Sequence, residues 1–134
     1  MKRITKLGNM KPANTKLWLT KLGQPAKLML AAVAAYFIIF SALSVLKHEA
    51  FNSTAFDLGI FDQNVWMFSN SQNFVNTVNG FYPFADHVQP ILYAVALLYK
   101  FAATPLLLLI LQAAAVSLGA IPLYLIARRK LGEK

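Results

Sequence analysis

Two long runs of apolar residues dominate the sequence, and charged residues mark where each run ends. The first run, LMLAAVAAYFIIFSALSVL at 28–46, holds nineteen uncharged residues between Lys27 and Lys47. As a helix it would be about 28 Å long, close to the roughly 30 Å of a bilayer's hydrocarbon core. A cleaved signal peptide is the alternative, but the run exceeds the usual length of about 7–15 apolar residues and no small-residue cleavage site follows. We therefore predict a transmembrane helix at 28–46.

The second run, at 90–127, contains one charged residue, Lys100, and is divided by a proline. Pro105 suits the first position of a helix, where a backbone N–H is not needed. Thr104 precedes it, and its hydroxyl can cap the helix that follows. This punctuation predicts one helix at 90–103, a break, and a second helix at 105–127.

These two helices differ in what their lengths allow. The helix at 90–103 would be about 21 Å long, too short to cross a bilayer, so we expect it to be interfacial or re-entrant. The helix at 105–127 would be about 34 Å long, enough for a second transmembrane helix, with a kink at Pro122. Gln112 lies near the middle of that span, and both an inter-helix hydrogen bond and a functional polar site are consistent with its position.

The charges are arranged in a basic, acidic, basic order. Seven of the 13 Lys and Arg residues lie at 1–27, the basic leader, and Arg128, Arg129 and Lys130 begin the basic tail at 128–134. Four of the five acids lie between the apolar runs, at 47–89. The positive-inside rule then places both termini in the cytoplasm and residues 47–89 outside a cell membrane that the chain crosses twice. A third span would export the cluster that begins at Arg128, and the charge pattern indicates no nucleic-acid partner.

Composition agrees with a lipid bilayer as the main partner. Hydrophobic residues make up 57% of the chain and charged residues 13%, against about 25% in soluble domains. The absence of cysteine excludes disulfides and thiolate chemistry. The predicted fold is an all-α membrane protein. Its two transmembrane helices are joined by an extracytoplasmic loop with two short interfacial helices, at about 55–68 and at 90–103.

The stretch FDLGIFDQ at 56–63 carries two of the acids, Asp57 and Asp62. At 100° per residue they lie about 140° apart on a helix, which disfavours a paired-carboxylate site and leaves one functional aspartate. Thr54 and Asp57 also match a capping box, in which Asp57 would serve the helix N-terminus instead of chemistry. Asp62 is interpreted as a solvated charge that helps to keep the loop outside.

A second group of polar residues lies in FADHVQP at 84–90. Asp86 and His87 are neighbours, and Gln89 is held extended by the following proline. An Asp–His pair can coordinate a metal or relay a proton, although a structural or solvated histidine is the simpler interpretation.

Three stretches together resemble a known family: FNSTAFDLGIFDQNVW, DHVQPILYAVALLYK and LLLLILQAAAVSLGAIPLYLIARRKLG. The chain is similar, over roughly residues 28–132, to the N-terminal part of a predicted multispan membrane family, domain of unknown function twenty-seventy-nine. That family is in turn similar to GT-C glycosyltransferases.

The resemblance implies a catalytic or metal-contacting carboxylate near the start of the first loop helix, which corresponds to Asp57. It also implies a polyprenyl-phosphate sugar donor and transfer on the outer face. Asp57 would act there either as a general base on the acceptor hydroxyl or by holding a divalent cation, such as Mg²⁺ or Mn²⁺, against the donor phosphate. Under the same resemblance, Asp86, His87 and Gln89 are candidate substrate-binding residues. The chain departs from better-studied members, which commonly have an Asp-Glu pair at this place. Here Asp57 is followed by Leu58. We expect the front part of a longer enzyme, incomplete alone.

Two other functions remain open. A small two-span membrane interaction or assembly protein without catalytic activity could pack the small residues AAAVSLGA at 113–120 against partner membrane helices. A small oligomeric transporter would have Gln112 in its favour.

Overall fold

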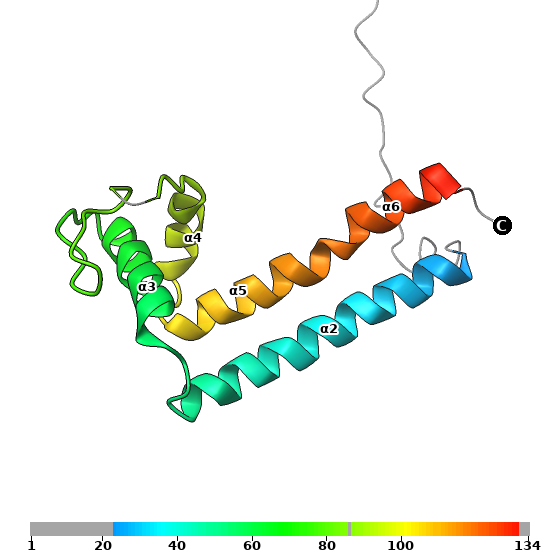
Figure 1. Ribbon diagram of the computed structural model, residues 1–134, viewed down its shortest axis with the longest axis horizontal. Helices are drawn as coiled ribbons and strands as arrows, with labels where there is room; N and C mark the ends of the chain where they lie inside the picture. The colour runs from blue at the N-terminus through cyan, green and yellow to red at the C-terminus, as the bar shows by residue number, and fades with distance from the viewer. Residues whose placement is uncertain (1–22, 86, 132–134) are drawn as a thin grey trace, which may run out of the picture.

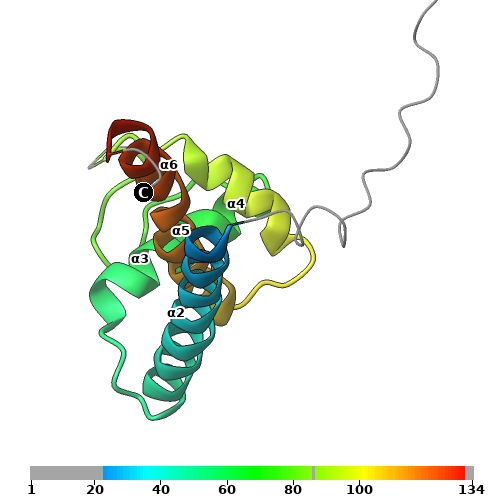
Figure 2. The same ribbon diagram turned by 90° about the vertical axis from the view of Figure 1, so that its right-hand side faces the viewer.

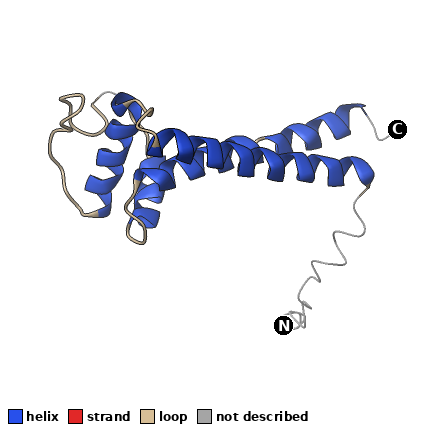
Figure 3. Cartoon of the chain, turned by 90° about the horizontal axis from the view of Figure 1, so that it is seen from below, coloured by secondary structure: helices blue, strands red, loops and turns tan. Residues whose placement is uncertain are grey.

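A computed structural model describes residues 23–85 and 87–131, and every regular element in these ranges is a helix (Figure 3). The elements, in chain order, are α2 (Gln24–Glu49), α3 (Ala55–Ser69), α4 (Ile91–Tyr99), α5 (Pro105–Leu118) and α6 (Ala120–Leu131). The predicted all-α membrane fold is thereby confirmed. The basic leader lies almost wholly outside the described residues.

Two helices are long and apolar enough to cross a membrane, and they lie side by side (Figure 1). One is α2, with 26 residues, and the other is α5 continued by α6, with 27 residues from Pro105 to Leu131. They run antiparallel, so that α2 begins and α6 ends at the same end of the pair. Helix α2 begins four residues before the apolar run, because Pro25 sits in its first turn, where proline costs no hydrogen bond.

The second long helix breaks between α5 and α6. The sequence predicts a kink at Pro122, whereas the helix breaks one turn earlier, at Gly119, the residue between α5 and α6. Figure 1 shows the rod bending between these two helices. Proline cannot donate to the carbonyl four residues before it, which is that of Leu118, and its ring crowds that carbonyl. The Gly119 N–H closes α5 by donating to the carbonyls of Ala115 and Val116, at 3.1 and 3.2 Å.

Small side chains line the contact between the two long helices. Ala113 and Ser117, one turn apart on α5, are buried, and α5 packs along α2. On α2 the less exposed positions recur every three to four residues, through Val33, Phe37 and Ser41. Small residues at such a contact let two backbones approach closely, which favours association in lipid.

Residues 50–104, which we call the inter-span segment, fold at one end of the helix pair. Figure 1 shows α3 running steeply across that end, and Figure 2, viewed along the pair from its other end, shows α3 and α4 behind it. Helices α3 and α4 pack together around a small core of Val65, Leu92, Ala96 and Tyr99. Aromatic rings of Phe68, Phe84 and Tyr93 extend this core; their centroids lie 4.7–5.6 Å apart.

The polar loop after α3 is fixed by one fully buried side chain, Asn76. Its Nδ2 donates to the Ile60 carbonyl at 2.9 Å and to Oδ1 of Asn64 at 2.8 Å, and its Oδ1 accepts from the Val78 N–H at 2.9 Å. Next to it, Oε1 of Gln63 accepts from Thr77. Because a buried amide must satisfy its donors and acceptor, these bonds fix the loop on α3.

The boundary between α4 and α5 follows the sequence closely. The Thr104 hydroxyl accepts from the Leu106 N–H at 3.4 Å, which confirms the predicted cap, and Pro105 begins α5. Helix α4 is shorter than the predicted 90–103. Its last residue, Tyr99, donates its hydroxyl proton to side-chain and backbone oxygens outside α4, and Thr104 is extended, as a residue before proline prefers.

Candidate functional site

Asp57 lines a cavity of about 660 Å³ in the described part of the chain. The cavity lies where α3 meets the two long helices. Its lining consists of Ser44, Lys47, Ser53, Thr54, Asp57, Leu58, Phe61, Leu92, Leu108, Leu109 and Gln112. Its walls therefore combine two opposite charges and several hydrogen-bonding side chains with a broad apolar surface.

Asp57 differs from the other polar residues of its helix. Asp62, Gln63 and Asn64 each accept a hydrogen bond from another part of the inter-span segment. The exposed carboxylate of Asp57 makes no hydrogen bond or ion pair with any described residue. Since the fold does not use this carboxylate, it is available to a ligand.

The predicted capping box is formed only in part. Thr54 occupies the N-cap position of α3 in an extended conformation, but its hydroxyl makes no capping hydrogen bond. Asp57 lies in the first turn, where its charge complements the positive end of the helix dipole. The capping interpretation of Asp57 is thus reduced to this weak electrostatic contribution.

Lys47 is the cation of the cavity, and the sequence did not single it out as a site residue. It lies in the last turn of α2, and its side chain lines the same cavity as Asp57. Neither it nor Asp57 forms an ion pair with a described residue. The sequence feature that could have drawn attention to Lys47 is its position as the first charged residue after the apolar run at 28–46.

Asp62 is not the solvated loop charge that the sequence suggested. It is half-buried, and its Oδ1 accepts a hydrogen bond from the Tyr99 hydroxyl at 2.5 Å. The same hydroxyl also lies 3.0 Å from the Thr104 carbonyl oxygen. Burial, followed by the hydrogen bond to Asp62 and the charge of Asp62, raises the pKa of Tyr99 well above its ordinary value. Asp62 therefore joins α3 to α4 and to the start of α5.

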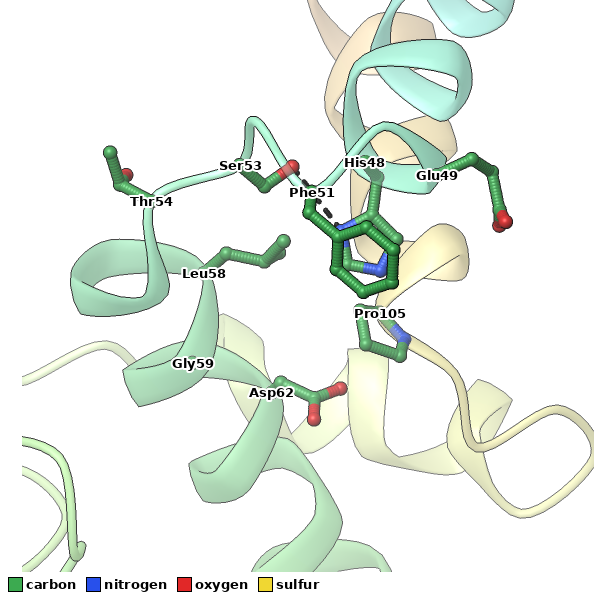
Figure 4. Close-up of a pocket in the computed structure, with 9 residues that line it drawn as sticks. All are labelled: His48, Glu49, Phe51, Ser53, Thr54, Leu58, Gly59, Asp62 and Pro105. Carbon is green, nitrogen blue, oxygen red and sulfur yellow. Dashed lines mark hydrogen bonds between the residues drawn. The ribbon is translucent and has the colours of Figure 1, made fainter.

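Asp62 also lines a second cavity, of about 320 Å³, between the end of α2, the start of α3 and Pro105 (Figure 4). Figure 4 shows its carboxylate directed toward the start of α5, whereas that of Glu49 points away from the centre. On the opposite wall, Nδ1 of His48 lies 3.2 Å from Oγ of Ser53. Asp57 and Asp62 thus line different cavities, in agreement with their separation on the helix.

The predicted substrate-binding residues are not gathered around Asp57. His87 and Gln89 line a third, small cavity of about 40 Å³. Phe61 and Leu92 line both this cavity and that of Asp57, so the two cavities share a wall. The remaining predicted residue, Asp86, lies outside the described residues.

The described residues contain no group of three or more His, Asp or Glu side chains that could hold a metal ion. Asp57 is the single carboxylate lining its cavity among them. Most Mg²⁺ sites in proteins use one or two carboxylates together with substrate phosphates, and Mn²⁺ also prefers oxygen donors. A divalent cation held by Asp57 would therefore need a substrate phosphate for its other oxygen ligands.

Gln112 is exposed and lines the cavity of Asp57. It lies seven residues after Pro105, about 10 Å along the helix. Its amide makes no hydrogen bond to another described side chain, so the inter-helix bond proposed from the sequence is not formed within this part of the chain. Gln112 therefore extends the polar lining from the end of the helix pair into the span.

Comparison with known proteins gives one match. A family model described as "Predicted membrane protein (DUF2079)" covers residues 47–134, about two thirds of the chain. The match begins at Lys47, later than the resemblance expected from residue 28, and includes every residue that lines the Asp57 cavity except Ser44. Searches of the curated proteins and of the solved structures found no match. The chain belongs to the DUF2079 family of predicted membrane proteins.

Proposed function

We propose that this chain forms the N-terminal part of a GT-C-like glycosyltransferase, which uses a lipid-phosphate-linked sugar on the outer face of the membrane. The observation that carries the proposal is the unpaired carboxylate of Asp57 in an amphiphilic cavity beside two apolar helices. A lipid-linked donor needs both parts of such a site: polar groups for the phosphate and sugar, and an apolar surface for the chain.

Asp57 acts as the general base in this proposal. Its carboxylate accepts the proton of an acceptor hydroxyl as that oxygen attacks the anomeric carbon of the donor. The bond between that carbon and the phosphate oxygen breaks, and the lipid phosphate leaves with the bonding electrons. A positioned base of this kind contributes about 10²–10⁴-fold to the rate. Asp57 is also the carboxylate of the described lining that would contact a divalent cation beside the donor phosphate.

The residues of the second polar stretch, at 84–90, are proposed to bind substrate without taking part in proton transfer. Asp86, His87 and Gln89 are proposed to contact the acceptor or the donor phosphate from the neighbouring side. His87 and Gln89 are separated from Asp57 by the shared wall of Phe61 and Leu92. Contact with one bound substrate therefore requires that it extend past these two side chains.

The alternative function is a small membrane assembly protein without catalytic activity. It relied on small residues of 113–120 packing against partner helices. Ala113 and Ser117 are buried where α5 packs on α2. These two small residues are therefore covered by α2 and are not exposed to a partner helix. The observation that still favours a partner is the exposed amide of Gln112 on an apolar helix.

The test is the substitution Asp57→Asn in the full-length protein, in native membranes. We expect sugar transfer from a radiolabelled polyprenyl-phosphate donor to fall about 100-fold or more. The thermal unfolding midpoint should not change, because Asp57 makes no hydrogen bond to a described residue. Asp57→Glu, which keeps the carboxylate, should retain more transfer than Asp57→Asn. Near-normal turnover by Asp57→Asn would exclude the base assignment.

A further inference from the structure

The cavity of Asp57 is also lined by a cationic residue, Lys47, whose backbone belongs to the last turn of α2. The Lys47 carbonyl accepts a hydrogen bond from the Asn52 N–H at 3.0 Å, and this bond closes the helix. A lysine in the last turn is also favoured by the negative end of the helix dipole. Lys47 lines the cavity and has no carboxylate partner among the described residues. An unpaired cation in a built cavity favours an anionic ligand.

Other groups around Lys47 define the shape of that ligand. The hydroxyls of Ser44, Ser53 and Thr54 line the same cavity and can donate hydrogen bonds to an anion. Apolar side chains form the rest of the wall: Leu58, Phe61, Leu92, Leu108 and Leu109. An anionic head on an apolar chain matches both surfaces, whereas a free inorganic anion would leave the apolar wall unused.

The charge of the cavity limits the charge of the head group. Lys47 and Asp57 are the two charged residues in its described lining, and their charges cancel. A phosphodiester brings one negative charge, which Lys47 can neutralise. A diphosphate would bring at least one more negative charge next to the Asp57 carboxylate, with no second cation there to offset it.

We infer that Lys47 binds the phosphate of a lipid phosphodiester in the cavity of Asp57. This inference rests on the proposed function for the location of the site, but it assigns a different residue and a binding step. A phosphodiester on an apolar chain can come from a lipid-linked sugar or from a membrane phospholipid. The experiment therefore measures binding and separates these sources.

The probe is farnesyl methyl phosphate, a phosphodiester with one negative charge. Its binding is measured by calorimetry to the full chain in dodecyl maltoside micelles, which contain no phosphate. Lys47→Gln should weaken binding about tenfold or more, the range of a hydrogen bond to a charged group. Lys47→Arg should restore most of the affinity. Lys100→Gln is the matched control, since Lys100 lines a different cavity, and it should bind as the unmodified chain does.

Three further probes complete the design. Farnesyl methyl ether, which lacks the charge, should bind equally to the unmodified chain and to Lys47→Gln. Dimethyl phosphate, which lacks the chain, should not compete; equal competition would overturn the lipid part of the inference. Strong competition by phosphatidylglycerol added to the micelles would support the role of Lys47 and identify a phospholipid headgroup as the source.

The inference fails if the unmodified chain does not bind farnesyl methyl phosphate, or if Lys47→Gln binds it unchanged. These outcomes are independent of the transfer assay. Asp57→Asn should keep or improve binding of the phosphodiester, because it removes a negative charge from the cavity. Intact binding by the unmodified chain, combined with normal transfer by Asp57→Asn, would reject the base and retain the phosphate site.

Discussion

Phe51 ends α2 in a backbone conformation that glycine normally adopts. Its φ is +56°, its N–H donates to the His48 carbonyl at 2.9 Å, and the Asn52 N–H closes the motif on Lys47. This is the Schellman arrangement, with phenylalanine at the left-handed position. A residue with a Cβ costs about 1–2 kcal/mol there. The ring is 96% exposed and recovers little of that cost by burial.

We therefore predict that Phe51→Gly stabilises the protein by about 1 kcal/mol. The free energy of unfolding can be measured in mixed detergent micelles, by titrating a denaturing detergent against a mild one. Phe51→Ala is the control, because it removes the ring and keeps the strained backbone. If glycine proves no more stable than alanine, the backbone of residue 51 is not strained as described.

At the scale of the elements, Tyr99 joins three helices through one hydroxyl group. It donates to Asp62 on α3 and lies within hydrogen-bonding distance of the carbonyl of Thr104, which precedes α5. A hydrogen bond to a charged group contributes about 1.5–3 kcal/mol. We predict that Tyr99→Phe lowers the free energy of unfolding by this amount, since it removes the hydroxyl and leaves Asp62 half-buried without that partner.

The raised pKa of Tyr99 adds a pH dependence with a definite sign. The folded state favours the neutral phenol, so this stabilisation is complete below the ordinary tyrosine pKa of about 10 and is lost as the pH rises above it. The unfolding midpoint should therefore decrease between pH 9 and pH 11. The decrease should be smaller in Tyr99→Phe; equal slopes for the two proteins would contradict the coupling to this residue.

The helices that could be predicted from the sequence are those whose boundaries are set by residues next to them in the chain. Thr104 and Pro105 lie next to the helix that they begin, and charges bound the long apolar run that forms most of α2. The bond between Tyr99 and Asp62 joins residues 37 positions apart, and Asn76 reaches Ile60 across 16 positions. No periodicity encodes such pairs, which is why the sequence alone indicates a solvated charge at Asp62.

The candidate site likewise combines a residue that a sequence motif indicates with one that only the folded structure brings near it. Asp57 was found from its place in a motif, but Lys47 was read as the end of a span. The cavity that joins them depends on how α3 crosses the helix pair, and the Tyr99 hydroxyl links α3 to the residue before α5 at this crossing. Only the folded chain brings these two charges into one lining.

At the scale of the whole molecule, the antiparallel pair determines where the basic clusters lie. Lys27, in the first turn of α2, and the cluster of Arg128, Arg129 and Lys130 in the last turn of α6 are at the same end of the pair (Figure 1). The inter-span segment occupies the other end. The positive-inside rule therefore predicts that the basic end faces the cytoplasm and that the Asp57 cavity lies on the outer side.

We predict this orientation from single-cysteine labelling, which is clean because the chain contains no cysteine. Asn73→Cys places the thiol in the exposed loop after α3, and a membrane-impermeant maleimide should label it in intact cells. Lys130→Cys, exposed at the other end, should react only after permeabilisation. The reverse pattern would place Asp57 on the cytoplasmic side, and labelling of both thiols in intact cells would mean that the helix pair does not cross the membrane as described.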